Sequence, residues 1–554
     1  PSVTGGTGSD DAVVVFEYFV PEFDADGQRI IDASTGDDVL SLNNASADGY
    51  WTPLDERDPL AYPTIDPDGP EHILTDKSIA IQKSVRVVND VNHPGPTPGD
   101  TLEYTLDFQI SDYFTFDDLV VVDKFSDGQR FDDTFIPTFT VTDRDGTTTG
   151  TFTDTLTVDE SQYNPCGDGS TTLTFRLSQA MVQNGAPDGI LVGGRAVAPD
   201  AGPATGRIVF RTVIQNVYTC IYPSGEAPLD QGDSVGNAVT ITGEVLVNGT
   251  PPTSQDPKQY ESDDSHASIS VAQGSLSKTL YARNGSTSGD LTQFAPGDTI
   301  TSRLRFTLPS SDVEQLSLPD YLPQPELRAT QMVTFTDVIS ATPPAAGHAQ
   351  FGPAETFRDI SGIVPTLTTD GTANSVRFWW GDYDDPQNRP SEIDILFTVT
   401  VRDDPFADGL FLTNQVRESD RNTELRVFTR DAIVQFKLTE PVLRITKGVV
   451  ASDNPQAQFS PATVGPVVFS PPGGSCPRFS GTIHSTNLAA NPINSNVSKV
   501  DAGDRVTFAI VVENIGSGLH GAFDIVISDT LPAELQVPST GLNLCVTDGT
   551  GATI

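Results

Sequence analysis

The stretch from Gly274 to Pro323, GSLSKTLYARNGSTSGDLTQFAPGDTITSRLRFTLPSSDVEQLSLPDYLP, decides the fold because its pattern occurs three times in the chain. It contains a lysine on a strand-like segment, a turn ending in Gly-Asp, an alternating strand and a later aspartate. In the three copies these residues are Lys83, Asp100 and Asp123; Lys278, Asp298 and Asp320; and Lys447, Asp504 and Asp529. Internal repetition at a nearly constant spacing predicts a tandem array of domains.

The composition predicts β-rich domains. The chain of 554 residues contains 47 Gly and 42 Pro, and long runs of helix-forming residues are missing. Segments such as TLEYTLDFQI (101–110) and TITSRLRFTL (299–308) alternate as half-buried strands do. Many short strands bounded by turn residues are typical of antiparallel sandwiches. We expect no helix longer than the segment LSQAMVQNG (177–185).

The repeats divide the chain into four expected parts. Residues 1–75 are interpreted as the C-terminal part of a preceding β repeat, with a strand at AVVVFEYFV (12–20), followed by a connector rich in Pro and Asp. Two complete sandwich repeats are expected at 76–267 and 268–440, the second opening with ASISVAQ (267–273). Residues 441–554 form a third repeat, which is incomplete at its C-terminus. We interpret the chain as an internal piece of a longer protein.

The charge of the chain limits its partners. Lys and Arg total 32 against 75 Asp and Glu, a net charge of −43, and such a surface repels nucleic acid and anionic membranes. No apolar run reaches about 18 residues, so no membrane span is expected. Few lysines and a large acidic excess suit a protein of high-salt or calcium-rich water, and equally a protein that simply needs solubility.

The repeat motifs resemble a known family. PGDTLEYTLDF, AGDRVTFAIVVEN, VISDTLPAEL and GNAVTI together resemble the surface repeat catalogued as domain of unknown function eleven, over most of residues 76–554. Members of that family are immunoglobulin-like β-sandwiches strung along large bacterial and archaeal cell-surface and secreted proteins. The resemblance implies an all-β chain of tandem immunoglobulin-like antiparallel β-sandwiches in an extracellular, cell-surface or secreted location. It says little about ligands.

Rare lysines on the opening strands suggest a covalent crosslink. We expect an asparagine on the closing strand of each complete repeat to lie beside the lysine, as in pilin and adhesin domains with intramolecular isopeptide bonds. Such a bond needs a buried, neutral amine and a protonated carboxylic acid beside the amide. The isopeptide candidates are Lys83, Asp123 and Asn237, and Lys278, Asp320 and Asn414. The alternative is that the lysines protect exposed edge strands and that the asparagines belong to turns or bulges.

The turn aspartates have a simpler expected role. Asp100 and Asp298 follow Pro-Gly, where an aspartate usually accepts hydrogen bonds from backbone amides.

The four cysteines favour disulfides. They have no metal-type spacing, and pairing Cys166 with Cys220 and Cys476 with Cys545 would staple loop-rich domains in an oxidising setting. Four buried free thiols are the alternative. Four N-x-Ser/Thr triplets are weak glycosylation candidates, headed by Asn44, Asn248, Asn284 and Asn496.

Calcium is the one cofactor that the loops suggest, and none is required. Carboxylates gather on Gly- or Pro-bearing loops, as a hard cation prefers, although none of the loops has the full EF-hand pattern. The candidate ligands are Asp24, Asp26, Asp66, Asp68, Asp382 and Asp384. Solvated turns are the simpler interpretation of each loop, and an ion between domains is expected in so acidic a chain.

The sequence favours a structural role over catalysis. No nucleophile elbow, zinc-protease or phosphate-loop motif is present, so no enzyme is expected. We expect a non-enzymatic protein of an extracellular filament, sheath or surface layer that associates with itself into a polymer or lattice. The alternative is a cell-surface adhesin that binds glycan or protein through loops such as 340–392, where tryptophans could stack on sugars. Core packing is the simpler role for Trp51, Trp379 and Trp380.

Overall fold

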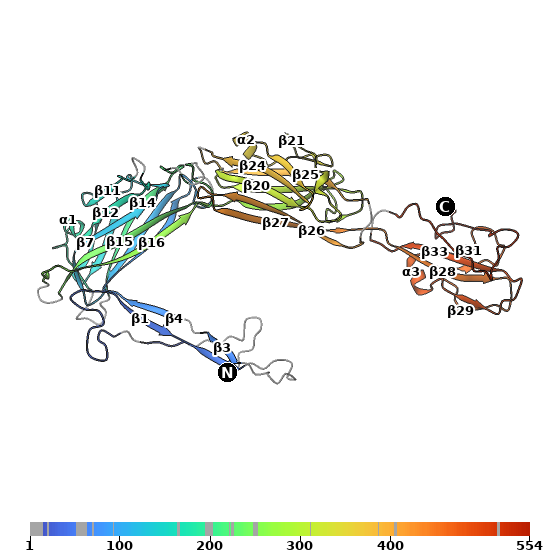
Figure 1. Cartoon of the computed structure of the whole chain (residues 1–554), viewed down its shortest axis with the longest axis horizontal. Helices are drawn as coiled ribbons and strands as arrows, with labels where there is room; N and C mark the ends of the chain where they lie inside the picture. Colours follow the sequence, from blue (N-terminus) through green and yellow to red (C-terminus); the bar gives the residue numbers. More distant parts are fainter. Residues whose placement is uncertain are drawn as a thin grey trace.

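The structure is a computed structural model. It describes all residues except 1–14, 19–20, 51–63, 69–70, 92–93, 163–166, 194–202, 221, 223–226, 248–252, 311, 386, 404–406 and 518–520. Two β-sandwiches follow one another along the chain, with a two-stranded ribbon before them and a smaller unit after them (Figure 1).

The first sandwich consists of two sheets around one core. One sheet has the order β10 (Gly146–Thr151), β9 (Thr138–Asp143), β14 (Ala204–Ile214), β6 (Thr101–Ile110) and β5 (Ile79–Asn89), with β8 (Gln129–Phe131) also paired to β14. The other has the order β11 (Leu156–Asp159), β12 (Thr171–Arg176), β7 (Thr115–Phe125), β15 (Ser234–Leu246) and β16 (Tyr260–Ser270), with β13 (Leu191–Val192) paired to β7. Helix α1 (Leu177–Gln183) follows β12, as expected.

Alternation explains why these segments form half-buried strands. In β6 every second side chain, from Leu102 to Ile110, faces the core, and Tyr104 stacks on Phe210 of β14 with ring centroids 5.2 Å apart. Each such pair adds about 0.5–1.5 kcal/mol to the stability that burial provides.

The second sandwich repeats the arrangement. One sheet has the order β17 (Ser275–Arg283), β19 (Thr299–Leu308), β25 (Ser391–Thr400), β22 (His348–Phe351) and β21 (Thr334–Ile339). The other has the order β18 (Gln293–Phe294), β27 (Val427–Leu438), β26 (Phe411–Arg421), β20 (Val313–Tyr321), β24 (Ser375–Tyr383) and β23 (Thr366–Asp370). The short helices η1 (Ala329–Gln331) and α2 (Phe357–Ser361) lie in its connections, and a second apolar core fills the space between the sheets.

A short, hydrogen-bonded connection joins the two sandwiches. Only residues 271–274 separate β16 from β17. The N–H of Val271 donates to the carbonyl of Asp233 at 2.7 Å, and the N–H of Gly274 donates to Oε1 of Gln231 at 2.6 Å. The first sandwich therefore holds both ends of the connection.

Outside the sandwiches, the N-terminal ribbon pairs β1 (Val39–Asn44) with β4 (Glu71–Asp76) and β2 (Ala47–Tyr50) with β3 (Thr64–Asp68). In the smaller third unit, the one long strand pair among the described residues is β28 (Leu443–Ser452) with β33 (Val506–Asn514). Its short pairs are β29 (Gln458–Ser460) with β32 (Asn496–Ser498) and β30 (Val468–Phe469) with β31 (Phe479–Ser480). Helix α3 (Ser485–Ala490) lies between β31 and β32 in the sequence. Its core is small and centres on Val450, Leu488 and Ile493.

Several expected elements differ from the observed ones. ASISVAQ does not open the second repeat, because most of it belongs to β16, which pairs with β15 along its whole length and completes the first sandwich. The boundary expected after residue 267 therefore falls inside β16. In the expected strand 12–20, the described residues 15–18 form no strand. The expected binding loop 340–392 is not one continuous loop, because it contains β22, α2, β23 and β24.

Candidate functional site

The same strand register places the lysine in all three repeats. The lysine strand pairs with the strand after the turn, and the partners of the lysines are Leu106, Leu304 and Ile510. These are positions 106, 304 and 510, each six residues after the turn aspartate at 100, 298 or 504. The lysine therefore has the same position relative to the turn in each repeat.

The turn aspartates have the backbone role expected of them. Asp100 Oδ2 accepts the N–H of Thr97 at 2.8 Å, and Asp298 Oδ2 accepts the N–H of Ala295 at 2.8 Å. In both cases the donor lies three residues earlier, so the carboxylate closes the turn.

In the first sandwich, Lys83 crosses the core between the sheets. Its strand β5 lies at the edge of one sheet, and its Nζ forms a hydrogen bond and ion pair with Oδ2 of Asp123 on β7 of the other sheet. Both side chains are completely buried. The Nζ atom lies 4.9 Å from the ring centroid of Tyr104 and 5.5 Å from that of Phe210, so the surroundings are aromatic and dry.

Asn237 lies beside this pair on β15, the strand next to β7. Asp123 faces Val239 in the β7–β15 register, and Asn237 is two residues before Val239, on the same face of the sheet. Asn237 is buried and lowers the pKa of Asp123, yet neither its Oδ1 nor its Nδ2 makes a hydrogen bond of regular geometry. A buried carboxamide without regular hydrogen bonds is costly, so this asparagine is an unusual core residue.

The second sandwich has the same triad in the same register. Nζ of Lys278 on β17 pairs with Oδ2 of Asp320 on β20, and both side chains are completely buried. Asp320 faces Val416 of β26, and Asn414 is two residues before Val416. The Oδ1 atom of Asn414 accepts no hydrogen bond. The two repeats differ in sequence over most of their length, yet each contains the same kind of buried site.

Burial moves the pKa values of lysine and aspartate toward each other. Desolvation lowers the pKa of Lys83 to about 8, against the opposing attraction of Asp123. Desolvation also raises the pKa of Asp123 to about 6, although Lys83 and Asn237 favour its charged form. The pKa of Lys278 is lowered and that of Asp320 is raised for the same reason. Transfer of the proton from the ammonium to the carboxylate is therefore much easier than in water.

In the third unit, Lys447 and Asp529 come together at the surface. Lys447 Nζ lies 2.6 Å from Asp529 Oδ1, but both side chains are more than 40% exposed. The amine and the carboxylate therefore remain solvated and keep an ordinary surface ion pair.

The asparagine strands are not the closing strands that the sequence suggested. β16 follows β15 in the first sandwich and β27 follows β26 in the second, and each is the outer neighbour of the asparagine strand in its sheet. The asparagines therefore lie on inner strands, which explains their burial. In the first sandwich this could not be predicted, because the alternating end of β16 resembles the start of the next domain.

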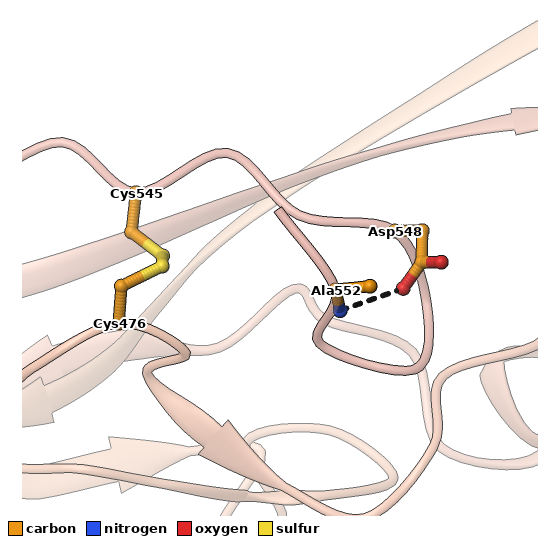
Figure 2. Close-up of a disulfide and its surroundings, with 4 residues drawn as sticks. All are labelled: Cys476, Cys545, Asp548 and Ala552. Atoms are coloured by element: carbon orange, nitrogen blue, oxygen red, sulfur yellow. Dashed lines mark hydrogen bonds between the residues drawn. A yellow bond between two sulfur atoms is a disulfide. The ribbon is translucent and has the colours of Figure 1, made fainter. Parts of the chain in front are cut away.

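The predicted disulfide between Cys476 and Cys545 is confirmed, with its Cα atoms 5.8 Å apart. It joins two loops of the third unit beside a turn in which the N–H of Ala552 donates to Oδ1 of Asp548 at 3.0 Å (Figure 2). Cys220 is also disulfide-bonded, and Cys166, its predicted partner, lies outside the described residues.

The predicted calcium ligands have different surroundings. Asp24 Oδ1 accepts the N–H groups of Asp26 and Gln28, as in a solvated turn. Asp382 Oδ1 accepts the N–H of Gln315 at 2.8 Å, whereas Asp384 lies in a group of acidic side chains between the two sandwiches. The side chains of Asp66 and Asp68 lie outside the described part of the chain.

Of the glycosylation candidates, Asn44, Asn284 and Asn496 are exposed, and Asn248 lies outside the described residues. Trp380 packs in the second core. The guanidinium carbon of Arg377 lies 4.5 Å from the ring centroid of Trp379, and Trp51 is not among the described residues. In the described residues, none of the helices has the length and apolar character needed to cross a bilayer.

Comparisons with known proteins give partial structural likenesses. No protein-family model matches the chain, and no curated protein matches it. The C-terminal domain of the Streptococcus agalactiae antigen I/II polypeptide BspA is 10% identical, with a TM-score of 0.22, over 65% of this chain and 99% of that one. BcpA, the major pilin subunit of Bacillus cereus, is 10% identical with a TM-score of 0.22, over 68% of this chain and 79% of that one.

The collagen-binding subdomain of the Enterococcus faecalis surface protein ACE is a further likeness, with 10% identity and a TM-score of 0.16 over 34% of this chain and 94% of that one. These structures are bacterial surface and pilin domains. At such TM-scores the overlap is small, so the chain's own triads carry the functional interpretation.

Proposed function

We propose that the chain is a non-enzymatic structural protein of an extracellular filament, sheath or surface layer, whose two complete sandwiches are locked by isopeptide bonds. The bonds join Lys83 to Asn237 and Lys278 to Asn414. The observation that carries the proposal is the repeated triad, in which a buried amine, a buried carboxyl group and a buried carboxamide occupy the same register in both sandwiches.

The chemistry follows from the surroundings of the amine. Asp123 takes a proton from the Lys83 ammonium, and the neutral Nζ attacks Cγ of Asn237. The Nζ–Cγ bond forms and the Cγ–Nδ2 bond breaks. Asp123 gives its proton to Nδ2, which leaves as ammonia, and takes the second proton from Nζ. The carboxyl group polarises the amide carbonyl and is regenerated, so lysine and asparagine become one secondary amide with the net loss of one ammonia. The same steps apply to Lys278, Asp320 and Asn414.

Such bonds suit a protein under tension. Each would tie the edge strand that opens a sandwich to an inner strand of the facing sheet, 154 (237 − 83) or 136 (414 − 278) residues later in the chain. The sheets could then not separate when the chain is pulled from its ends. A polymer or lattice of such chains outside the cell is the setting in which this resistance is useful.

Intact-mass measurement on the denatured, reduced chain tests the proposal. The mass should be lower than that of the sequence by two molecules of ammonia, and peptide mapping should join the segment of Lys83 to that of Asn237. Lys447→Arg is the matched control, because its lysine is exposed and the loss of two ammonia molecules should persist. A mass equal to that of the sequence would exclude both crosslinks.

A further inference from the structure

Acidic side chains from both sandwiches meet where the two domains touch. The N–H of Gln231 donates to the carbonyl of Asp312 at 3.3 Å, so the turn after Pro228 in the first sandwich lies against the start of β20 in the second. The Thr423 hydroxyl, in the turn after β26, lies 2.6 Å from Oδ2 of Asp233 and 3.0 Å from Oδ2 of Asp230. The contact is therefore polar and specific.

Three carboxylates in this contact are arranged around one point. One oxygen each of Asp230, Glu314 and Asp384 lies within 4.8 Å of the other two. Asp230 comes from the first sandwich, and Glu314 and Asp384 come from β20 and the loop after β24 in the second. The group is complete only when both domains are in place.

Buried oxygen atoms in the same contact lack hydrogen bonds. Asp230, Asp233 and Asp312 are each only 1% exposed. Oδ1 of Asp230, Oδ1 of Asp233 and Oδ2 of Asp312 accept no hydrogen bond. Because an unsatisfied buried carboxylate oxygen is among the most costly groups in a protein, each of these atoms needs a positive or donating partner.

Other carboxylates act on the charges of Asp230 and Asp312. Besides its burial, Asp230 is acted on chiefly by the negative charges of Asp233, Glu314 and Asp312, and these effects raise its pKa to about 9. Burial raises the pKa of Asp312 to about 8, with further contributions from Asp384 and Asp385. Repulsion between like charges therefore acts on Asp230 and Asp312 in this contact.

We propose that Asp230, Glu314 and Asp384 bind a divalent cation of the calcium class between the two sandwiches. All the donors are oxygen atoms, with no histidine or cysteine among them, and a hard cation with about six to eight oxygen ligands suits such a set. Asp233 and Asp312 supply further carboxylate oxygens at the same contact. The cation neutralises the carboxylates and holds the orientation of one domain against the next.

The test uses the full chain with CaCl2 or MgCl2 as the only probe. Isothermal titration calorimetry of the chelator-treated protein should show one site that is saturated by calcium, and the melting temperature should rise with calcium concentration. Asp230→Asn should reduce calcium affinity at least tenfold and remove the rise. The amide relieves repulsion between carboxylates, so the variant is expected to fold without calcium.

Matched controls separate this site from the exposed loops. Asp290→Asn removes an acid from an exposed turn of the second sandwich, where Asp290 Oδ1 accepts the N–H of Thr292, and it should leave calcium binding unchanged. Asp384→Asn, at a half-buried position, should weaken binding as Asp230→Asn does. The proposal is overturned if wild-type protein binds no calcium, or if binding survives both cluster variants.

Discussion

Lys83 and Asp123 form an ion pair that bridges the two sheets of the first sandwich, with neither side chain exposed to solvent. Lys278 and Asp320 form the same pair in the second sandwich. A buried ion pair stabilises a fold weakly, because desolvation offsets most of its attraction. The pair is repeated beside an asparagine whose Oδ1 accepts no hydrogen bond, which suggests a chemical role.

Replacement of the aspartates should prevent the crosslinks. After allowance for the substituted side chain, the mass of Asp123→Ala should exceed that of the wild-type protein by one ammonia, because one crosslink does not form. The same holds for Asp320→Ala, and the double variant should be heavier by two ammonia molecules. In each case the amine and the amide remain, but the acid that relays protons is lost. Intact mass under denaturing conditions measures this directly.

Stability gives a second readout of the same variants. Without the bond, a buried lysine is left unpaired at a cost of about 3–5 kcal/mol, so the affected sandwich should also unfold at lower temperature. Asp529→Ala removes the exposed partner of Lys447 and should change neither the loss of ammonia nor the stability of the sandwiches. An Asp123→Ala protein with the full loss of ammonia would show that Asp123 does not assist the reaction.

Glu355 should make the second sandwich less stable as the pH rises. Its Oε1 and Oε2 accept the N–H groups of Arg358 and Asp394, but burial raises its pKa to about 8 from an ordinary value of 4.5. The folded state thus holds the proton more tightly than the unfolded state, so stability is lost between about pH 4.5 and 8, by roughly 1.4 kcal/mol for each pKa unit.

Glu355→Gln does not titrate, which makes it the comparison for this effect. Urea unfolding followed by tryptophan fluorescence, at several values between pH 5 and 9, should show the stability of wild-type protein falling relative to the variant. Parallel pH profiles for the two proteins would contradict the prediction.

The disulfide of the third unit should carry much of its stability. The unit has a small core, and Cys476 and Cys545 are 69 residues apart in sequence. Closing a loop of that length stabilises a domain by about 4 kcal/mol in the chain-entropy model. The double substitution Cys476→Ser and Cys545→Ser should therefore speed proteolysis of residues 441–554. Cys220→Ser should leave that rate unchanged.

Gly503 should resist replacement because of its backbone conformation. Its φ is 98°, and a Cβ atom there would meet no other atom within 4 Å, so strain in the backbone is the only cost. Gly503→Ala should destabilise the third unit by about 1–2 kcal/mol, measured by thermal unfolding. Gly521→Ala, at a position without positive φ, should have little effect.

Much of the fold could be predicted because turn residues mark where the strands begin and end. The expected segments 101–110 and 299–308 coincide with β6 and β19, since Gly-Asp turns precede them and alternation is strong. The boundary expected after residue 267 cuts β16, because the outward side chains of this strand, from Tyr260 to Ser270, are mostly polar. Its place depends on pairing with β15, which the sequence does not reveal.

The triads could be predicted because lysine is rare in this chain and stands at a fixed distance from the repeated turn. The acidic contact between the sandwiches could not be predicted from the sequence, because Asp230 and Glu314 belong to different repeats. Neither residue has a motif of its own. Asp384 was recognised as a ligand candidate, but its neighbours in space come from the docking of two domains.

The connection between the sandwiches has a consequence for long arrays. Residues 271–274 are hydrogen-bonded to Gln231 and Asp233, so they leave little freedom for one domain to rotate about the next. If successive repeats are joined in this way, each domain is rotated and translated by the same amount relative to the domain before it. Such an array would have a defined helical pitch, visible as layer lines in fibre diffraction.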